Sequence, residues 1–320
     1  MRKALIIGIN EYFVSENNLP GCVEDASSLA SVLQNHANGD PNFSCKLITT
    51  SSEASTSNLK VQIQQLFDKS KDTEIALFYF SGHGFVESTG GYFICSDTKS
   101  GNEGISMQWL QEIVNQSSIK NKVIILDCCY AGAQAVVPDN YGLSANSILS
   151  SGTTILSASR QNETSAATKL GSIFTNLVLD ALKGGAADIL GNITPASIYS
   201  YVDKALGPWN QRPVFKTNIS RFFSLRSSQP SISKERLRNI IKYFKSPFDS
   251  FPLNPSFEPT SKNPDKNNLI IFKDLQKYRD VGLITPVDTE HMYYAAIESK
   301  SCRLTAMGLQ YWKLIKENKL

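Results

Sequence analysis

Three short runs of the sequence are apolar or β-branched at every position, and they constrain the fold more than any other feature. They are Ile75–Phe80, Val123–Leu126 and Thr153–Leu156. Strands of this kind are buried on both faces, which is typical of a mainly parallel sheet covered by helices on both sides. Helical periodicity at Val23–Leu33 and Leu59–Phe67 fits this arrangement. The pattern predicts an α/β sandwich of three layers with a mainly parallel central sheet.

The same pattern places further elements along the first part of the chain. We expect strands at Lys3–Ile9 and Cys45–Thr49, a helix around Trp109–Val114, and another at Ile173–Leu182. Gly90-Gly91 lies between two short apolar segments, which indicates a hairpin.

Composition excludes several classes of protein. Hydrophobic residues make up 41% of the 320 residues and charged residues 19%, enough for an ordinary core. The net charge of +3 is too small to indicate a polyanionic partner. No apolar run approaches the ~20 residues of a membrane helix. Because there are only six cysteines and no export signal, we expect thiols in a reducing compartment and a cytoplasmic protein without membrane association.

Two of the apolar runs lead directly into reactive residues. One continues into the motif SGHG, residues 81–84, and the other into DCCYAG, residues 127–132. Because the carboxyl ends of parallel strands meet at one edge of a sheet, His83 and Cys129 are expected to lie within reach of each other. A histidine can remove the proton of a cysteine thiol and later protonate a leaving amine. The backbone amides of Gly84 and Cys129 would stabilise the oxyanion. The pattern indicates a Cys-His acyl-transfer site.

These residues resemble the caspase-like cysteine peptidases, most closely the metacaspase and bacterial orthocaspase branch. His83 precedes Cys129 by 46 residues, near the roughly 50-residue spacing of caspases. The segments ALIIGIN, LPGCVEDA, ILSASRQNETSA, RPVF and RFFSL extend the resemblance over residues 2–226. It implies a caspase-like fold, with His83 as base and acid and Cys129 as nucleophile. Cys128 is then a packed strand residue.

The resemblance also implies a substrate. Metacaspase-like enzymes favour arginine or lysine before the scissile bond, and their pocket positions correspond here to Cys22, Asp25, Ser81 and Asp127. Two carboxylates around a slot attract a cation and reject an anion. Taken alone, Asp25 also suits stabilisation of a helix terminus, and Asp127 suits hydrogen bonding to loop amides. We expect a protein substrate cleaved after Arg or Lys.

Calcium and self-processing are less clearly indicated. Many metacaspases require calcium, but the acidic residues after the histidine motif, Glu87, Asp97 and Glu103, are sparse. A calcium cage needs six to eight oxygen ligands, so we expect no metal and no cofactor, with calcium dependence left open. Arg160 and Lys169 lie in a polar stretch that suits either self-cleavage or a solvated loop.

The composition changes near residue 230. The segment from Gln229 onwards holds 15 basic and 10 acidic residues, and residues 246–266 hold five of the 13 prolines. We expect the main domain at residues 1–228, a basic helix with a Pro-rich linker at 229–266, and a small module at 267–320.

Within the small module, the sequence predicts a helix at Leu269–Tyr278, a strand at Met292–Ile297 and a last helix capped by Thr305. This order resembles a winged-helix module. Its modest charge argues against nucleic acid as the partner, so we expect it to recruit a regulatory protein, with structural support as the other possibility.

Two competing interpretations remain open. The chain can be an inactive caspase-like adaptor that acts through its C-terminal module. Alternatively, Cys22, His83, Cys128 and Cys129 can form a metal site, although vicinal cysteines lack the usual spacing of zinc ligands. By analogy with bacterial relatives that carry such appendices, the resemblance implies a role in regulated cell death or antiviral defence.

Overall fold

The computed structural model describes residues 1–68, 72–87, 90–100, 103–131, 149–158, 171–207 and 213–320, with only the backbone of 129–131. The chain forms two compact units. The first comprises Met1–Ala187 and Gly191–Gln229, and the second comprises Asp188–Leu190 and Pro230–Leu320. Each unit has its own core and is described separately below.

The first unit is built on a sheet whose central strands are parallel. The strand order is β2-β1-β3-β6-β7-β9, and only β9 runs antiparallel to its neighbour on this path. The strands are β1 (Arg2–Gly8), β2 (Ser44–Ile48), β3 (Ile75–Glu87), β6 (Asn121–Ala131), β7 (Thr153–Ser157) and β9 (Val214–Asn218). The prediction of a mainly parallel sheet is therefore confirmed.

A short antiparallel extension leaves the sheet at the end of β3. There β4 (Gly90–Phe93) pairs with β3 in the predicted hairpin, and β5 (Ile105–Ser106) pairs with β4. A separate two-stranded ribbon joins β8 (Asn192–Ile193) to β10 (Arg226–Ser227).

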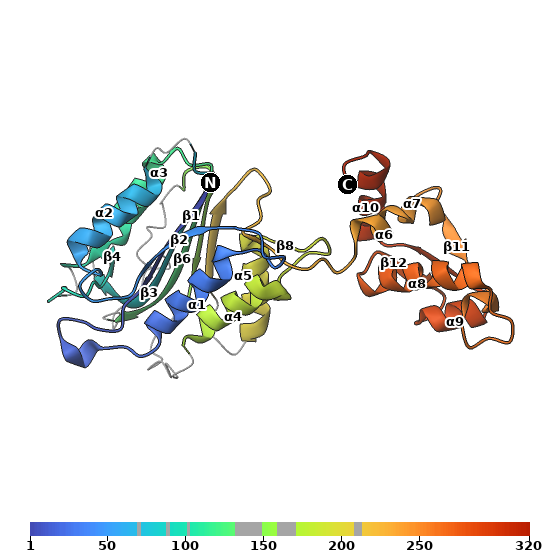
Figure 1. Cartoon of the computed structure of the whole chain (residues 1–320), viewed down its shortest axis with the longest axis horizontal. Helices are drawn as coiled ribbons and strands as arrows, with labels where there is room; N and C mark the ends of the chain where they lie inside the picture. Colours follow the sequence, from blue (N-terminus) through green and yellow to red (C-terminus); the bar gives the residue numbers. More distant parts are fainter. Residues whose placement is uncertain (69–71, 88–89, 101–102, 132–148, 159–170, 208–212) are drawn as a thin grey trace. The chain divides into compact units, whose positions relative to one another are not determined.

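Helices cover both faces of the sheet, as Figure 1 shows. On one face lie α2 (Thr56–Phe67) and α3 (Met107–Gln116), and on the other lie α1 (Cys22–Gln34), α4 (Ile173–Asp180) and α5 (Pro195–Leu206). The helix α4 runs on into a π-helical turn, η3 (Ala181–Gly185). Alternate β3 residues supply the two cores: Phe78 and Phe80 face α2 and α3, whereas Leu77 and Tyr79 face α1 and α4. The predicted three-layer sandwich is confirmed.

The second unit has a small antiparallel sheet with helices packed on it. Its strands are β11 (Ser250–Pro252), β12 (Ile284–Val287) and β13 (Ser301–Leu304), in the order β11-β13-β12. Its helices are α6 (Lys234–Arg238), α7 (Ile240–Tyr243), η5 (Pro255–Phe257), α8 (Lys266–Asp280), α9 (Met292–Ile297) and α10 (Ala306–Lys316).

Two expectations for this unit are wrong. Residues 229–266 are not a linker, because Leu237, Phe244 and Phe257 are buried in the same core as α8. Two of the five prolines lie where a fold tolerates them: Pro252 ends β11 and Pro255 begins η5. The predicted strand Met292–Ile297 is the helix α9, whose buried residues Met292, Ala295 and Ala296 follow helical spacing.

Candidate active site

His83 and Cys129 lie opposite each other on neighbouring strands. The parallel pairing of β3 and β6 runs without a break, with Ser81 opposite Asp127, Gly82 opposite Cys128, and His83 opposite Cys129. The side chain of Cys129 lies outside the described residues. The backbone register nevertheless brings the two positions together at the carboxyl edge of the sheet, where the sequence places them.

The His83 ring is held by the loop between β1 and α1. Its Nε2 lies 2.7 Å from the carbonyl oxygen of Asn17. A carbonyl only accepts hydrogen bonds, so Nε2 carries the proton of the neutral ring and Nδ1 has a free lone pair. Burial lowers the pKa of His83, while the Asn17 carbonyl opposes this shift. The ring is therefore a neutral base near pH 7, with Nδ1 as the proton-accepting atom.

A tyrosine that the sequence reasoning missed completes this environment. The Tyr12 hydroxyl accepts a hydrogen bond of 2.9 Å from the His83 backbone N–H. The two rings are 5.0 Å apart between centroids, with a tilt of 51°. Neither Tyr12 nor the Asn17 carbonyl is visible as a motif. The sequence shows only that two aromatic residues, Tyr12 and Phe13, follow the first strand, and nothing distinguishes Tyr12 from its neighbour.

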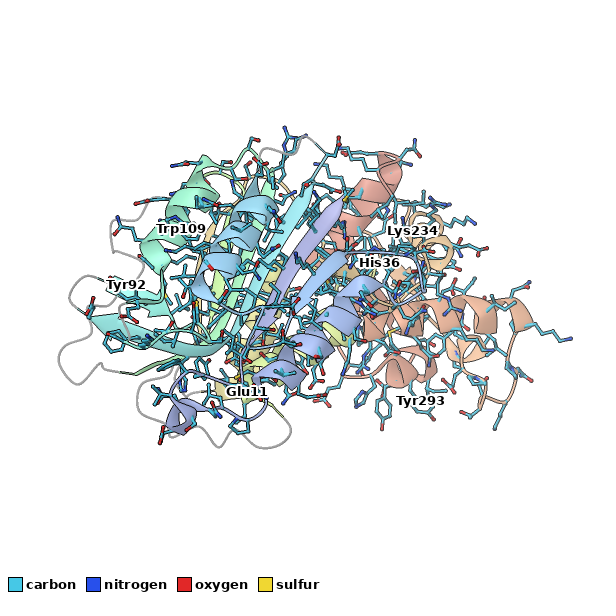
Figure 2. All side chains as sticks on the ribbon, turned by 60° about the vertical axis from the view of Figure 1, so that its left-hand side comes forward. Glu11, His36, Tyr92, Trp109, Lys234 and Tyr293 are labelled. Carbon is cyan, nitrogen blue, oxygen red and sulfur yellow. The ribbon has the colours of Figure 1, made fainter. Side chains whose placement is uncertain are left out.

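The loop that carries these groups, residues 9–21, is held by its own hydrogen bonds. The Asn18 side chain accepts from the Tyr12 N–H at 2.9 Å, and the Asn10 side chain accepts from the Val23 N–H at 3.0 Å. A short 3-10 helix, η1 (Ser15–Asn17), presents the Asn17 carbonyl. Glu11 marks this loop beyond the end of β1 in Figure 2.

Asp25 is a buried carboxylate at the start of α1, with 3% of its surface exposed. It accepts hydrogen bonds from the Ser172 N–H at 3.1 and 3.2 Å, and one from the Ser81 hydroxyl at 3.4 Å. It therefore lies at the N-terminus of α4 as well as in the first turn of its own helix, and both helix dipoles favour its negative charge. A Cβ at Gly171 would lie 2.1 Å from Asp25 Oδ1, so this approach requires a glycine.

Asp127 is a second buried carboxylate, 5% exposed, and it ends a short hydrogen-bond chain. The Thr175 hydroxyl donates to Asp127 Oδ2 at 2.6 Å, and the hydroxyls of Thr175 and Tyr79 are 2.6 Å apart. Because the single Thr175 proton goes to Asp127, Tyr79 donates to Thr175. Burial raises the pKa of Tyr79, and the charges of Asp127 and Asp25 raise it further. Both carboxylates thus act on the same buried region.

The two other predicted pocket residues differ in their surroundings. Ser81 is 2% exposed and donates a hydrogen bond to Asp25, so it lies beside the acidic pair formed by Asp25 and Asp127. Cys22 is the first residue of α1 and is 8% exposed. Cys128 is 1% exposed and belongs to the apolar core on the α2 and α3 face, consistent with a packed strand residue.

The predicted oxyanion amides lie inside the β3–β6 ladder. Ser81 O accepts from the Ile9 N–H, and the His83 N–H donates to Tyr12, both on the side away from β6. The alternating pleat therefore directs the Gly84 N–H towards β6, where Gly84 is opposite Tyr130. Use of the Gly84 amide as an oxyanion donor requires the two strands to separate beyond Gly82.

The described part of the chain contains no group of three or more His, Cys, Asp or Glu side chains that could hold a metal ion. Of the residues considered for calcium, Asp97 accepts from the Thr56 N–H and hydroxyl, and Glu103 accepts from two loop amides. Arg160 and Lys169 lie outside the described residues. None of the helices in the described ranges is long and apolar enough to cross a bilayer.

Comparisons with known proteins give a family and similar structures. A model of the caspase domain matches residues 1–225. A Geobacter sulfurreducens protein, solved as a structural genomics target, has 15% sequence identity and a TM-score of 0.52, covering 72% of this chain and 98% of its own. Caspase-1 from Spodoptera frugiperda has 17% identity and a TM-score of 0.48, covering 71% and 91%. No curated protein matches the chain.

Proposed function

The chain belongs to the caspase-domain family, and on that premise we propose that it is a cysteine endopeptidase with Cys129 as nucleophile and His83 as base. The observation that carries this proposal is the register of β3 and β6, which sets His83 opposite Cys129. The hydrogen bond from His83 Nε2–H to the Asn17 carbonyl supports it further, because it leaves Nδ1 able to accept a proton.

The proposed reaction follows from these roles. His83 Nδ1 takes the thiol proton of Cys129, and the thiolate attacks the peptide carbonyl to give a tetrahedral oxyanion. The imidazolium then gives its proton to the leaving amine, so a thioester remains on Cys129. Water, deprotonated by His83, hydrolyses that thioester and restores the free thiol. Stabilisation of the oxyanion by the Gly84 and Cys129 amides needs a local opening of the strand ladder.

The acidic pair supports specificity for basic residues. Asp25 and Asp127 are both buried on the sheet face covered by α1 and α4, and each is held by hydroxyl or amide donors. A cationic Arg or Lys side chain gains from two desolvated carboxylates, whereas an aspartate side chain would be repelled. We assign Cys22, Asp25, Ser81 and Asp127 to the pocket for the residue before the scissile bond.

The proposed preference for basic residues supports assignment to the metacaspase and orthocaspase branch, and by analogy with that branch we propose a role as a regulated bacterial effector of cell death or defence. The second unit is proposed to recruit a protein partner as a winged-helix module. Its helix–strand–helix order and its sheet order β11-β13-β12 support that architecture. Tyr293 and Tyr294, 45% and 47% exposed on α9, are residues of the kind that anchor protein interfaces. Figure 2 labels Tyr293.

The direct test compares the whole chain with its Cys129→Ala variant on peptides that end in Arg, Lys or Asp before the cleaved bond. We expect cleavage after Arg and Lys, and a loss of at least about 10³-fold in the variant. Cys128→Ala is the matched control and should retain activity. Each assay is run with calcium and with a chelator. Preference for Asp would defeat the pocket assignment, and equal inactivity of all proteins would favour the adaptor.

A further inference from the structure

The backbone of His83 lies at a gap in the hydrogen-bond ladder of β3. On the side away from β6, the partner of β3 is first β1, which ends with Gly8 opposite Ser81. The partner then becomes β4, whose pairing begins with Phe93 opposite Gly84. His83 falls between the two. Its carbonyl accepts from the Ile94 N–H at 3.0 Å, but neither strand supplies an acceptor for its N–H.

The Tyr12 hydroxyl supplies that acceptor. It lies 2.9 Å from the His83 nitrogen and takes the place of the strand carbonyl that β1 no longer provides. The approach is close, because a Cβ at Gly82 would lie 2.7 Å from the Tyr12 oxygen. The absence of a side chain at Gly82 therefore leaves room for the Tyr12 hydroxyl.

Tyr12 is itself well fixed. It is 8% exposed and packs in the core on the α2 and α3 face, and its N–H donates to the Asn18 side chain. Burial raises the pKa of its phenol well above the ordinary value, so the hydroxyl stays neutral. The same loop presents the Asn17 carbonyl to His83 Nε2. One loop thus holds His83 at its backbone and at its ring.

We propose that Tyr12 is a positioning residue that fixes the His83 imidazole by completing the β3 ladder and packing against the ring. The proposal rests on the function proposed above, since it concerns the same imidazole. Its physical basis is that proton transfer needs a fixed donor–acceptor geometry, and a shift of about 1 Å at a catalytic group costs up to about 10²-fold in rate. Tyr12 does not touch the reacting atoms.

The test is Tyr12→Phe in the whole chain, which removes the hydroxyl but keeps the ring. We expect kcat to fall about tenfold with KM within about twofold, because substrate contacts are unchanged. The alkylation rate of Cys129 by iodoacetamide should fall in parallel. Tyr199→Phe is the matched control, because that ring stacks on Phe215 and keeps its contact without the hydroxyl. The control should leave both rates unchanged.

A second variant tests the shared contact. Gly82→Ala forces the Tyr12 hydroxyl away from the His83 N–H, so its effect on kcat should be smaller in the Tyr12→Phe background than in the wild type. The contact of the new methyl group with Phe80 is the same in both backgrounds. Equal effects of Gly82→Ala in the two backgrounds would contradict the proposal.

The spectroscopic measurement needs no substrate. Imidazole ¹⁵N NMR should show His83 as the Nε2–H tautomer in the wild type and a mixture of tautomers in Tyr12→Phe. An unchanged tautomer together with an unchanged alkylation rate would overturn the inference. Lack of any peptidase activity in the wild type would instead contradict the proposed function, so the two failures are distinguishable.

Discussion

The two faces of the central sheet differ in chemistry where the strands end. On the face covered by α2 and α3, the β6 residues Ile124, Leu126 and Cys128 all belong to one apolar core. On the face covered by α1 and α4, Ile125 is apolar but Asp127 is a buried carboxylate. Because residues two apart on a strand share a face, position 129 continues the row of Asp127. The chemistry of this sheet edge is thus concentrated on one face.

The strongest test of this difference removes the charge of Asp127. In Asp127→Asn, the Thr175 hydroxyl keeps an acceptor, but the negative charge is lost. We expect kcat/KM for a peptide with Arg before the cleaved bond to fall by about 10²-fold or more, since a buried cation would lose its partner. A citrulline peptide, which is neutral and of similar shape, should lose much less. Equal losses on both peptides would contradict a charge-selective role.

Asp25→Asn should have the same sign and a smaller effect. The Asn side chain can still accept the Ser172 N–H, but its charge no longer faces the pocket. We expect a loss of roughly tenfold on the Arg peptide, because Asp127 remains. A larger effect on thermal stability than on Arg selectivity would show that Asp25 chiefly anchors α4.

The apolar face is tested by Cys128→Ala. The side chain is 1% exposed, so its removal leaves a small cavity in the core of the α2 and α3 face. We expect a loss of about 1 kcal/mol in the free energy of unfolding, measured with urea, and kcat/KM within about twofold of wild type. A loss of activity without a loss of stability would show that Cys128, on the face covered by α2 and α3, takes part in catalysis.

The sequence predicts much of this arrangement for identifiable reasons. The strands Ile75–Phe80 and Val123–Leu126 are apolar on both sides, so burial alone determines their place in the sheet. The two strands pair in parallel and end at the same edge of the sheet, and this register brings the histidine and cysteine motifs together. The chemistry and the fold are therefore encoded in the same two runs of residues.

The missed features depend on contacts that side-chain type does not encode. Every residue type has the same backbone carbonyl, so no sequence motif predicts the hydrogen bond between the Asn17 carbonyl and His83. Asp25 binds Ser172, which is 147 positions away, and no local pattern reports such a pair. In the second unit, proline content suggested a linker, but Phe244 and Phe257 are packed in a core that only the tertiary fold reveals.

The smallest expected effect concerns the pH dependence of kcat/KM. It tests whether Asp25 and Asp127 influence the protonation of His83. The pKa of His83 is lowered by burial, and the hydrogen bond to the Asn17 carbonyl only partly opposes this shift. A carboxylate partner would instead raise that pKa. As pH falls through the lowered pKa, His83 becomes protonated and can no longer accept the thiol proton. The acid limb of kcat/KM should therefore have its midpoint below 6.5.

The same profile measured in Asp127→Asn, with a substrate concentration far below KM, should have its acid limb at the same pH within about 0.3 units. The maximal kcat/KM falls because the Arg side chain of the substrate is held less well. The midpoint of the acid limb does not shift, because Asp127 acts on Tyr79 and Thr175 rather than on the imidazole. A wild-type midpoint at or above 7 that drops in Asp127→Asn would instead make this carboxylate an electrostatic partner of His83. Asp127 would then act on the protonation of His83 as well as on the Arg side chain, and the two roles would not be separate on this face of the sheet.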